Sequence, residues 1–151
     1  MNDENRKRVL FVCIGNACRS QMAEAFARAY GSDVIVPVSA GLYPADHLAS
    51  DTVEAMAEKN ISMTEQFPKN IRHLGRTPFD LVINMSGAAL PRGIAAPVRQ
   101  WDVEDPVMMD YEEHCEVRDQ IERLVMNLVL ELRREKTAPA FRGQGSGRLK
   151  L

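Results

Sequence analysis

The chain has 151 residues, a formal net charge of −2 and an ordinary share of charged residues, 26%. This length favours one compact domain that buries about two-thirds of its unfolded surface. The small charge argues against nucleic acid or a membrane as the main partner, and no apolar run approaches the roughly 18 residues of a membrane span.

Short apolar runs alternate along the chain with segments of helical periodicity. Strands are expected at residues 9–12, 34–38, 80–86 and 98–101, and helices at 20–30, 48–60 and 110–134, with one helical turn after Pro68. Pro37 favours the edge of a sheet for the second strand, and Gly31 is placed to end the first helix.

This alternation predicts an α/β fold, a four-stranded parallel sheet with helices on both faces. Residues 1–136 are expected to form a single domain. Residues 137–151 show no pattern, and we expect them to be a flexible C-terminal tail.

The cysteine content and the N-terminus bear on location. Three cysteines, an odd number, argue against a disulfide framework and favour a reducing compartment. The apolar stretch at 9–12 is too short for the core of a signal peptide. We therefore expect a cytoplasmic protein.

The loop between the first strand and the first helix is the candidate site. In parallel sheets, ligands bind beyond the carboxyl ends of the strands, where Cys13 lies. Gly15 allows a tight conformation, and the Asn16 side chain can hold the loop from within. Successive N–H groups at a helix N-terminus can surround a tetrahedral oxyanion. The residues expected to bind it are Ile14, Gly15, Asn16, Ala17, Cys18, Arg19 and Ser20.

Three side chains of this loop suggest covalent catalysis. Arg19 offers a planar fork for two oxygens of the oxyanion. The helix N-terminus and this cation stabilise a thiolate at Cys13, and Ser20 could donate a hydrogen bond to it. Cys13 is then a nucleophile aimed at the centre of a bound phosphate. A buried structural cysteine would explain Cys13 alone but not the spacing of all three residues.

The loop, Val12-Cys-Ile-Gly-Asn-Ala-Cys-Arg-Ser-Gln-Met-Ala-Glu24, resembles the phosphate loop of two families that share one fold. They are the low-molecular-weight protein tyrosine phosphatases and the thioredoxin-coupled arsenate reductases. The likeness continues through about residue 134, in 38–41, 79–85, 101–106 and 116–122. It implies the three-layer sandwich of phosphotyrosine protein phosphatase I.

The resemblance also implies a general acid and a mechanism. It selects Asp105, which Pro106 restricts to extended conformations, over Asp102 and Glu104. Cys13 would attack phosphorus while Asp105 protonates the leaving group, and water would then hydrolyse the cysteinyl phosphate. No metal or cofactor is required. The substrate would be a phosphorylated protein or a small phosphomonoester, with phosphate and vanadate as inhibitors.

The sequence is compatible with three functions. Our prediction among them depends on Ser86, at the end of the third predicted strand. Thioredoxin-coupled reductases carry two further cysteines from this point, but here Ser86 stands first and no cysteine follows before Cys115. We therefore predict a metal-independent protein tyrosine phosphatase. The alternatives are an arsenate reductase that uses an external thiol and a non-catalytic phosphate-binding module. Gln21 and Trp101 resemble the reductases, and Val107 and Met108 replace the tyrosines of the phosphatases.

The resemblance suggests further roles around the loop. Cys18 would form a reversible disulfide with Cys13, or it is a buried thiol that packs behind the loop. Tyr43 and His47 would form a wall of the substrate cleft, and Ser39 would support Asn16. The three histidines and three cysteines have no zinc-finger spacing, so we predict no metal site.

Overall fold

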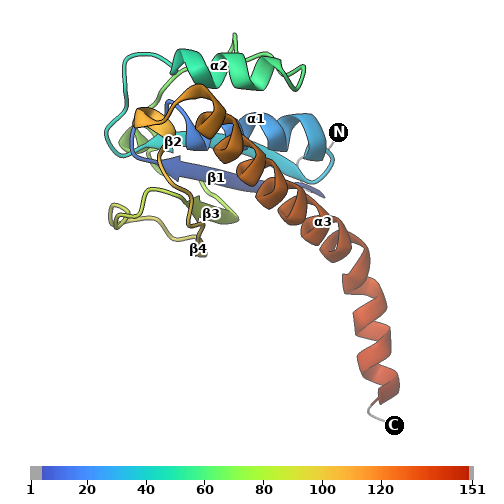
Figure 1. Ribbon diagram of the computed structural model, residues 1–151. Helices are drawn as coiled ribbons and strands as arrows, with labels where there is room; N and C mark the ends of the chain where they lie inside the picture. The colour runs from blue at the N-terminus through green and yellow to red at the C-terminus, as the bar shows by residue number, and fades with distance from the viewer. Residues whose placement is uncertain (1–4, 150–151) are drawn as a thin grey trace.

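The structure is a computed structural model that describes residues 5–149, with side chains described through Thr137. A four-stranded parallel sheet forms its centre, in the order β2-β1-β3-β4 (Figure 1). Its strands are β1 (Lys7–Cys13), β2 (Ile35–Gly41), β3 (Leu81–Asn84) and β4 (Val98–Gln100). The predicted α/β fold and parallel sheet are confirmed.

The position of each strand follows from its sequence. The side chains from Val9 to Cys13 are all buried, as expected for a strand at the centre of a sheet with neighbours on both sides. β2, which contains Pro37, lies at the edge. Cys13 pairs with Gly41 and Val12 with Asn84, so the carboxyl ends of three strands meet at one edge of the sheet.

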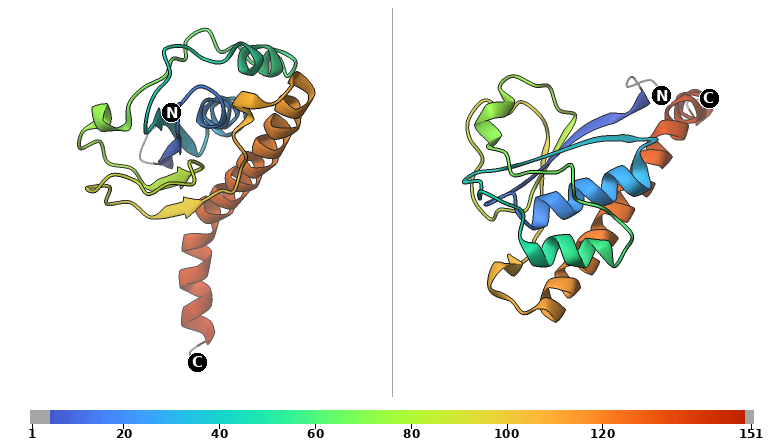
Figure 2. Two further views of the ribbon diagram at one scale, coloured as in Figure 1. Left: turned by 60° about the vertical axis from the view of Figure 1, so that its left-hand side comes forward. Right: turned by 90° about the horizontal axis from the view of Figure 1, so that it is seen from above.

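Three α-helices pack on one face of this sheet (Figure 2): α1 (Arg19–Gly31), α2 (Ser50–Ala57) and α3 (Tyr111–Leu149). Their core contacts include Met22, Phe26, Met56 and Ile121, all fully buried. α1 ends at Gly31, as its sequence predicts. A Cβ at Gly31 would lie 2.5 Å from a methyl carbon of Val129, so the glycine lets α1 and α3 pack closely.

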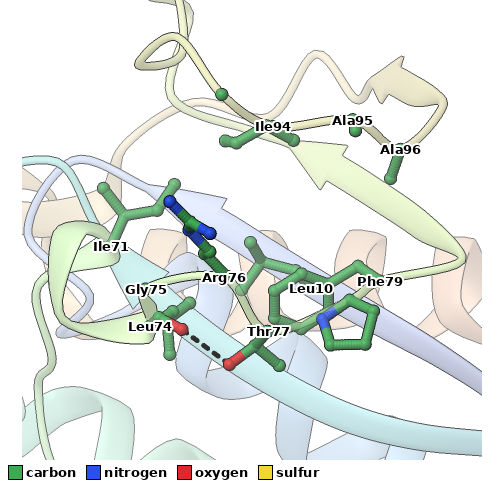
Figure 3. A pocket seen from close by; sticks show the side chains of 12 residues that line it. Leu10, Ile71, Leu74, Gly75, Arg76, Thr77, Phe79, Ile94, Ala95 and Ala96 are labelled. Atoms are coloured by element: carbon green, nitrogen blue, oxygen red, sulfur yellow. Dashed lines mark hydrogen bonds between the residues drawn. The ribbon is translucent and has the colours of Figure 1, made fainter.

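The opposite face carries a thinner layer. The 3-10 helix η2 (Ile71–Leu74) and two loops cover a second core cluster there, built on Leu10, Val12 and Val82. A cavity of about 350 Å³ lies in this layer, and the side chains that line it are drawn in Figure 3. Leu10, Ile71, Phe79 and Ile94 are among the residues that line it, and none of them belongs to the loop that follows β1.

α3 is longer than expected. It continues to Leu149, past the predicted end at residue 134 and away from the sheet (Figure 1). The backbone of the expected tail therefore continues this helix as far as Leu149, and residues 150–151 lie outside the described part of the chain. The single domain of residues 1–136 stays a prediction. Within residues 5–149, no helix combines the length and the apolar character needed to cross a membrane.

Candidate active site

The loop from Cys13 to Arg19 connects β1 to α1 at the edge where the strands end. Asn16 has a φ of 50°, in the left-handed region that asparagine tolerates better than most residues. The sequence suggested Gly15 for the tight conformation, but Gly15 has no left-handed φ. The loop thus turns at Asn16. Buried hydrogen bonds of the Asn16 side chain stabilise this turn.

The structure brings Cys13, Asn16 and Ser20 together. The Cys13 sulfur lies 2.9 Å from the Ser20 hydroxyl, and both side chains are buried. The Asn16 amide donates to the same hydroxyl oxygen at 2.7 Å. Because this leaves the hydroxyl proton free to point at sulfur, Ser20 can donate to a thiolate at Cys13.

Two backbone carbonyl groups fix the side chain of Arg19. Its Nη1 donates to the carbonyl oxygens of Met85, after β3, and of Val103, after β4, the latter at 3.0 Å. The residue is only 5% exposed. Two carbonyls on one nitrogen fix the plane of the guanidinium, so its remaining N–H groups are oriented before any oxyanion arrives.

Asp105 is brought to Arg19 across the site. Its Oδ2 lies 3.5 Å from Arg19 Nη2, and its side chain is 44% exposed. Its other oxygen accepts a hydrogen bond from Val107 N at 3.1 Å, which caps the short 3-10 helix η3 (Pro106–Met108). Glu104 instead lines a separate cavity beside α3, and Asp102 borders both that cavity and the one that Arg19 lines.

A polar network behind the loop was missed by the sequence analysis. Gln21 Nε2 donates to Asn16 Oδ1 at 2.9 Å, and Lys69 N donates to the same oxygen at 2.8 Å. Glu24 accepts from the Ser39 hydroxyl and lies 3.8 Å from Lys69 Nζ. Burial lowers the pKa of Lys69, and the charge of Glu24 opposes this effect. Polar residues at buried positions of α1 carry this network.

Ser39 was predicted to support Asn16, and the structure connects the two residues indirectly. Its hydroxyl donates to Glu24, not to Asn16. Glu24 and Asn16 both contact Lys69. Lys69 Nζ lies near the Glu24 carboxylate, and Lys69 N donates to the Asn16 side chain. Ser39 therefore contacts the loop only indirectly, through two intervening residues.

Gly41 is also part of the site, although the sequence did not single it out. A Cβ there would lie 2.7 Å from Ile14 O and 2.9 Å from Asn16 Cβ. No real side chain tolerates such contacts, so only glycine lets the end of β2 approach the loop. The signal in the sequence was a glycine three residues past the predicted strand, at the end of the 38–41 motif.

Cys18 has a different environment from Cys13. It is 5% exposed and part of the main core cluster. Burial raises the pKa of its thiol to about 11, although a hydrogen bond with Thr52 works in the opposite direction. The Thr52 hydroxyl also lies 2.9 Å from His114 Nε2. The sequence gave no reason to connect Thr52 or His114 with the loop.

The predicted wall residues lie on a segment that runs beside the loop. Tyr43 N donates to Ile14 O at 2.8 Å, and Ala45 N donates to Gly15 O at 2.9 Å. The side chains of Tyr43 and His47 are exposed. Their part in recognising a substrate stays a prediction.

Ser86 lies after β3, next to the carbonyl that Arg19 binds. Its hydroxyl donates to Asn84 Oδ1 at 2.6 Å. Arg19, Ser86 and Trp101 are among the residues that line a cavity of about 430 Å³ at this point. Among the described residues, no group of three or more His, Cys, Asp or Glu side chains is arranged to hold a metal ion.

The family model for "low molecular weight phosphotyrosine protein phosphatase" matches residues 8–138, which include the whole candidate site. The chain belongs to this family. The resemblance inferred from the loop and the downstream motifs is therefore confirmed.

Individual relatives in this family carry a different name. The chain is 32% identical over 130 residues to a glutaredoxin arsenate reductase of Synechocystis, covering 83% of this chain and 98% of that protein. It is 34% identical over 122 residues to arsenate reductase 1 of Bacillus cereus, covering 78% and 90%. A solved structure described as an arsenate reductase in the phosphate binding state has 30% identity and a TM-score of 0.74, covering 83% and 98%.

These relatives overturn the functional prediction. The sequence analysis favoured a tyrosine phosphatase because Ser86 replaces a cysteine, yet the family members above are named as arsenate reductases. The prediction was wrong because Ser86 removes only one route for electrons. It leaves the oxyanion loop and the nucleophile unchanged.

Proposed function

We propose that this protein reduces arsenate to arsenite with an external thiol as the electron donor. The observation that carries the proposal is its similarity, above 30% identity over most of both chains, to proteins named as arsenate reductases. The geometry of the loop supports it, since arsenate has the tetrahedral shape and the charge for which such a loop is suited.

The first step forms a bond between sulfur and arsenic. The Cys13 thiolate attacks arsenic, and one oxygen leaves as water after Asp105 supplies a proton. Arg19 and the N–H groups of the loop stabilise the negative oxygens, because they are oriented before the substrate binds. Asp105 Oδ2 lies 3.5 Å from Arg19 Nη2, so the carboxyl group stands beside the oxyanion that Arg19 binds.

The second step transfers the electrons. A second sulfur attacks Cys13 Sγ, a disulfide forms, and the sulfur–arsenic bond breaks with its electron pair left on arsenic. Arsenic is thereby reduced from the +5 to the +3 state and leaves as arsenite. An external thiol then reduces the disulfide and restores Cys13. Phosphate and vanadate should compete with arsenate, since both fill the same loop.

The chemistry fits a reducing compartment. Cys13, Cys18 and Cys115 are all free thiols, and a reductase of this kind needs a steady supply of reduced thiol. We therefore place the protein in the cytoplasm as part of the same proposal.

The test is arsenate-dependent formation of arsenite by the purified protein. Arsenite is quantified by chromatography with three donors supplied separately: glutathione, a glutaredoxin with glutathione, and thioredoxin with its reductase. We expect turnover with at least one donor, inhibition by phosphate, and no loss in Cys115→Ser. No arsenite with any of these donors would overturn the proposal.

A further inference from the structure

The cavity on the face of the sheet opposite the three α-helices is separate from the candidate active site. η2 and the residues that follow it form one wall, and residues 93–96 form the other; Figure 3 shows these walls facing each other. Leu10, which is 1% exposed, contributes to the lining from β1. The volume of about 350 Å³ is within the range of cavities that bind small molecules.

The lining is mostly apolar, and several of its side chains are only partly buried. Leu74, Phe79 and Ile94 pack against the second core cluster, but water still reaches each of them. Covering such apolar surface is favourable by about 25 cal/mol for each Å². The lining therefore favours a ligand with an apolar chain.

Arg76 adds one charge to this apolar cavity. Of the described residues that line it, Arg76 alone is charged. Within the part of the chain whose side chains are described, the Arg76 guanidinium has no hydrogen-bond or ion-pair partner. In Figure 3 this group points toward Ile71, which also lines the cavity. Its N–H donors are therefore available to a ligand inside the cavity.

A carboxylate matches this guanidinium better than a phosphate does. The planar fork can donate two parallel hydrogen bonds to the two oxygens of one carboxylate. The single negative charge of a carboxylate also balances the single positive charge of Arg76. A phosphate monoester carries a charge of about −1.5 to −2 at pH 7. The described lining offers no second cation to compensate it.

The volume of the cavity sets the size of the ligand. At about 30 Å³ for each water-sized group, 350 Å³ holds roughly a dozen non-hydrogen atoms. We propose that the cavity is a second binding site, which takes a monocarboxylate with an apolar chain of about eight carbons. Its carboxylate binds Arg76, and its chain lies among the apolar side chains of the lining. The site is independent of the proposed function, because no residue of the oxyanion loop takes part in it.

Calorimetric titration with octanoate tests this inference. We expect one octanoate to bind to each chain, also when phosphate saturates the oxyanion loop. Arg76→Gln should weaken octanoate binding by about 3-fold to 10-fold, the effect of one exposed ion pair of good geometry. 1-Octanol has the same chain without the charge, so it should bind more weakly and be insensitive to Arg76→Gln. Arg72→Gln changes an exposed arginine of η2 outside the lining and should match the wild type.

A variant that fills the cavity provides the second test. Ala96 belongs to the lining, and Ala96→Leu should abolish the binding of octanoate and of 1-octanol alike. Phosphate binding and the Tm of each variant check that the fold is retained. No binding of octanoate by the wild type at millimolar concentration would overturn the proposal. Octanoate affinity that is unchanged in either folded variant, Arg76→Gln or Ala96→Leu, would place the ligand elsewhere and overturn it as well.

Discussion

Cys13 and Cys18 lie at the two ends of one loop, and their surroundings differ sharply. Cys13 ends β1 beside the Ser20 hydroxyl, at the edge where the strands of the sheet end. Cys18 is packed into the main core cluster, where burial raises the pKa of its thiol to about 11. Two residues of one type, five positions apart, therefore have different surroundings and should differ in reactivity. What surrounds each sulfur determines its chemistry.

The two thiols should differ most in their reaction with iodoacetamide. At pH 7 we expect Cys13 to be modified first and Cys18 roughly 100-fold more slowly, because a thiol with a raised pKa is almost entirely protonated. The rate at Cys18 should rise as the pH approaches about 11. Phosphate should protect Cys13 only. Peptide mass spectrometry gives both rates, and equal rates at pH 7 would remove the contrast between the two sites.

Arg19→Lys should lower kcat/KM for arsenate by about 100-fold or more, since lysine cannot reproduce a guanidinium fixed by two carbonyls. Steady-state formation of arsenite measures the effect. Arg72→Lys, a change at an exposed arginine on η2, is the matched control and should have wild-type activity. Activity retained in Arg19→Lys would mean that the loop N–H groups alone bind the oxyanion.

Asp105→Asn should lower kcat by about 10-fold to 100-fold, because an amide cannot supply the proton for the leaving oxygen. Phosphate should bind no more weakly, because the change removes a negative charge close to the oxyanion. Calorimetric titration with phosphate separates these effects from each other. Glu104→Gln is the control. A variant that loses phosphate binding together with kcat would show that Asp105 maintains the site rather than donating a proton.

Gly41→Ala should have the smallest effect, on stability. The new methyl would lie 2.7 Å from Ile14 O, so the loop must shift. We expect a cost of about 1–3 kcal/mol and a fall in Tm of several degrees. A Cβ at Gly15 meets nothing closer than 4.0 Å, so Gly15→Ala should retain the wild-type Tm. Equal melting temperatures for both variants would contradict this packing.

The loop could be predicted from the sequence because its signals are local. A buried strand, then Cys13, Arg19 and Ser20, then a helix start define an oxyanion site with little help from the rest of the chain. Asp105 needed the resemblance to a family, because no local pattern separates it from Asp102 and Glu104. Helical periodicity likewise found α3, although its end at Leu149 was missed.

The parts that were missed depend on tertiary packing. Thr52 and His114 approach each other only because α2 and α3 pack together, and no spacing in the sequence reports this. Gly41 has its role because β2 ends against the loop. The functional error at Ser86 has a similar origin. One missing cysteine closes a route through that residue but says nothing about a sulfur supplied by another segment or another molecule.

The central claim is that Cys13 reduces arsenate at this loop. Its most direct test compares arsenite formed by the wild type and by Cys13→Ser, with the thiol donor that supports turnover. We predict steady production by the wild type and a loss on the order of 10⁴-fold in the variant, since serine is a far weaker nucleophile. Arsenite formed at the wild-type rate by Cys13→Ser would contradict the account.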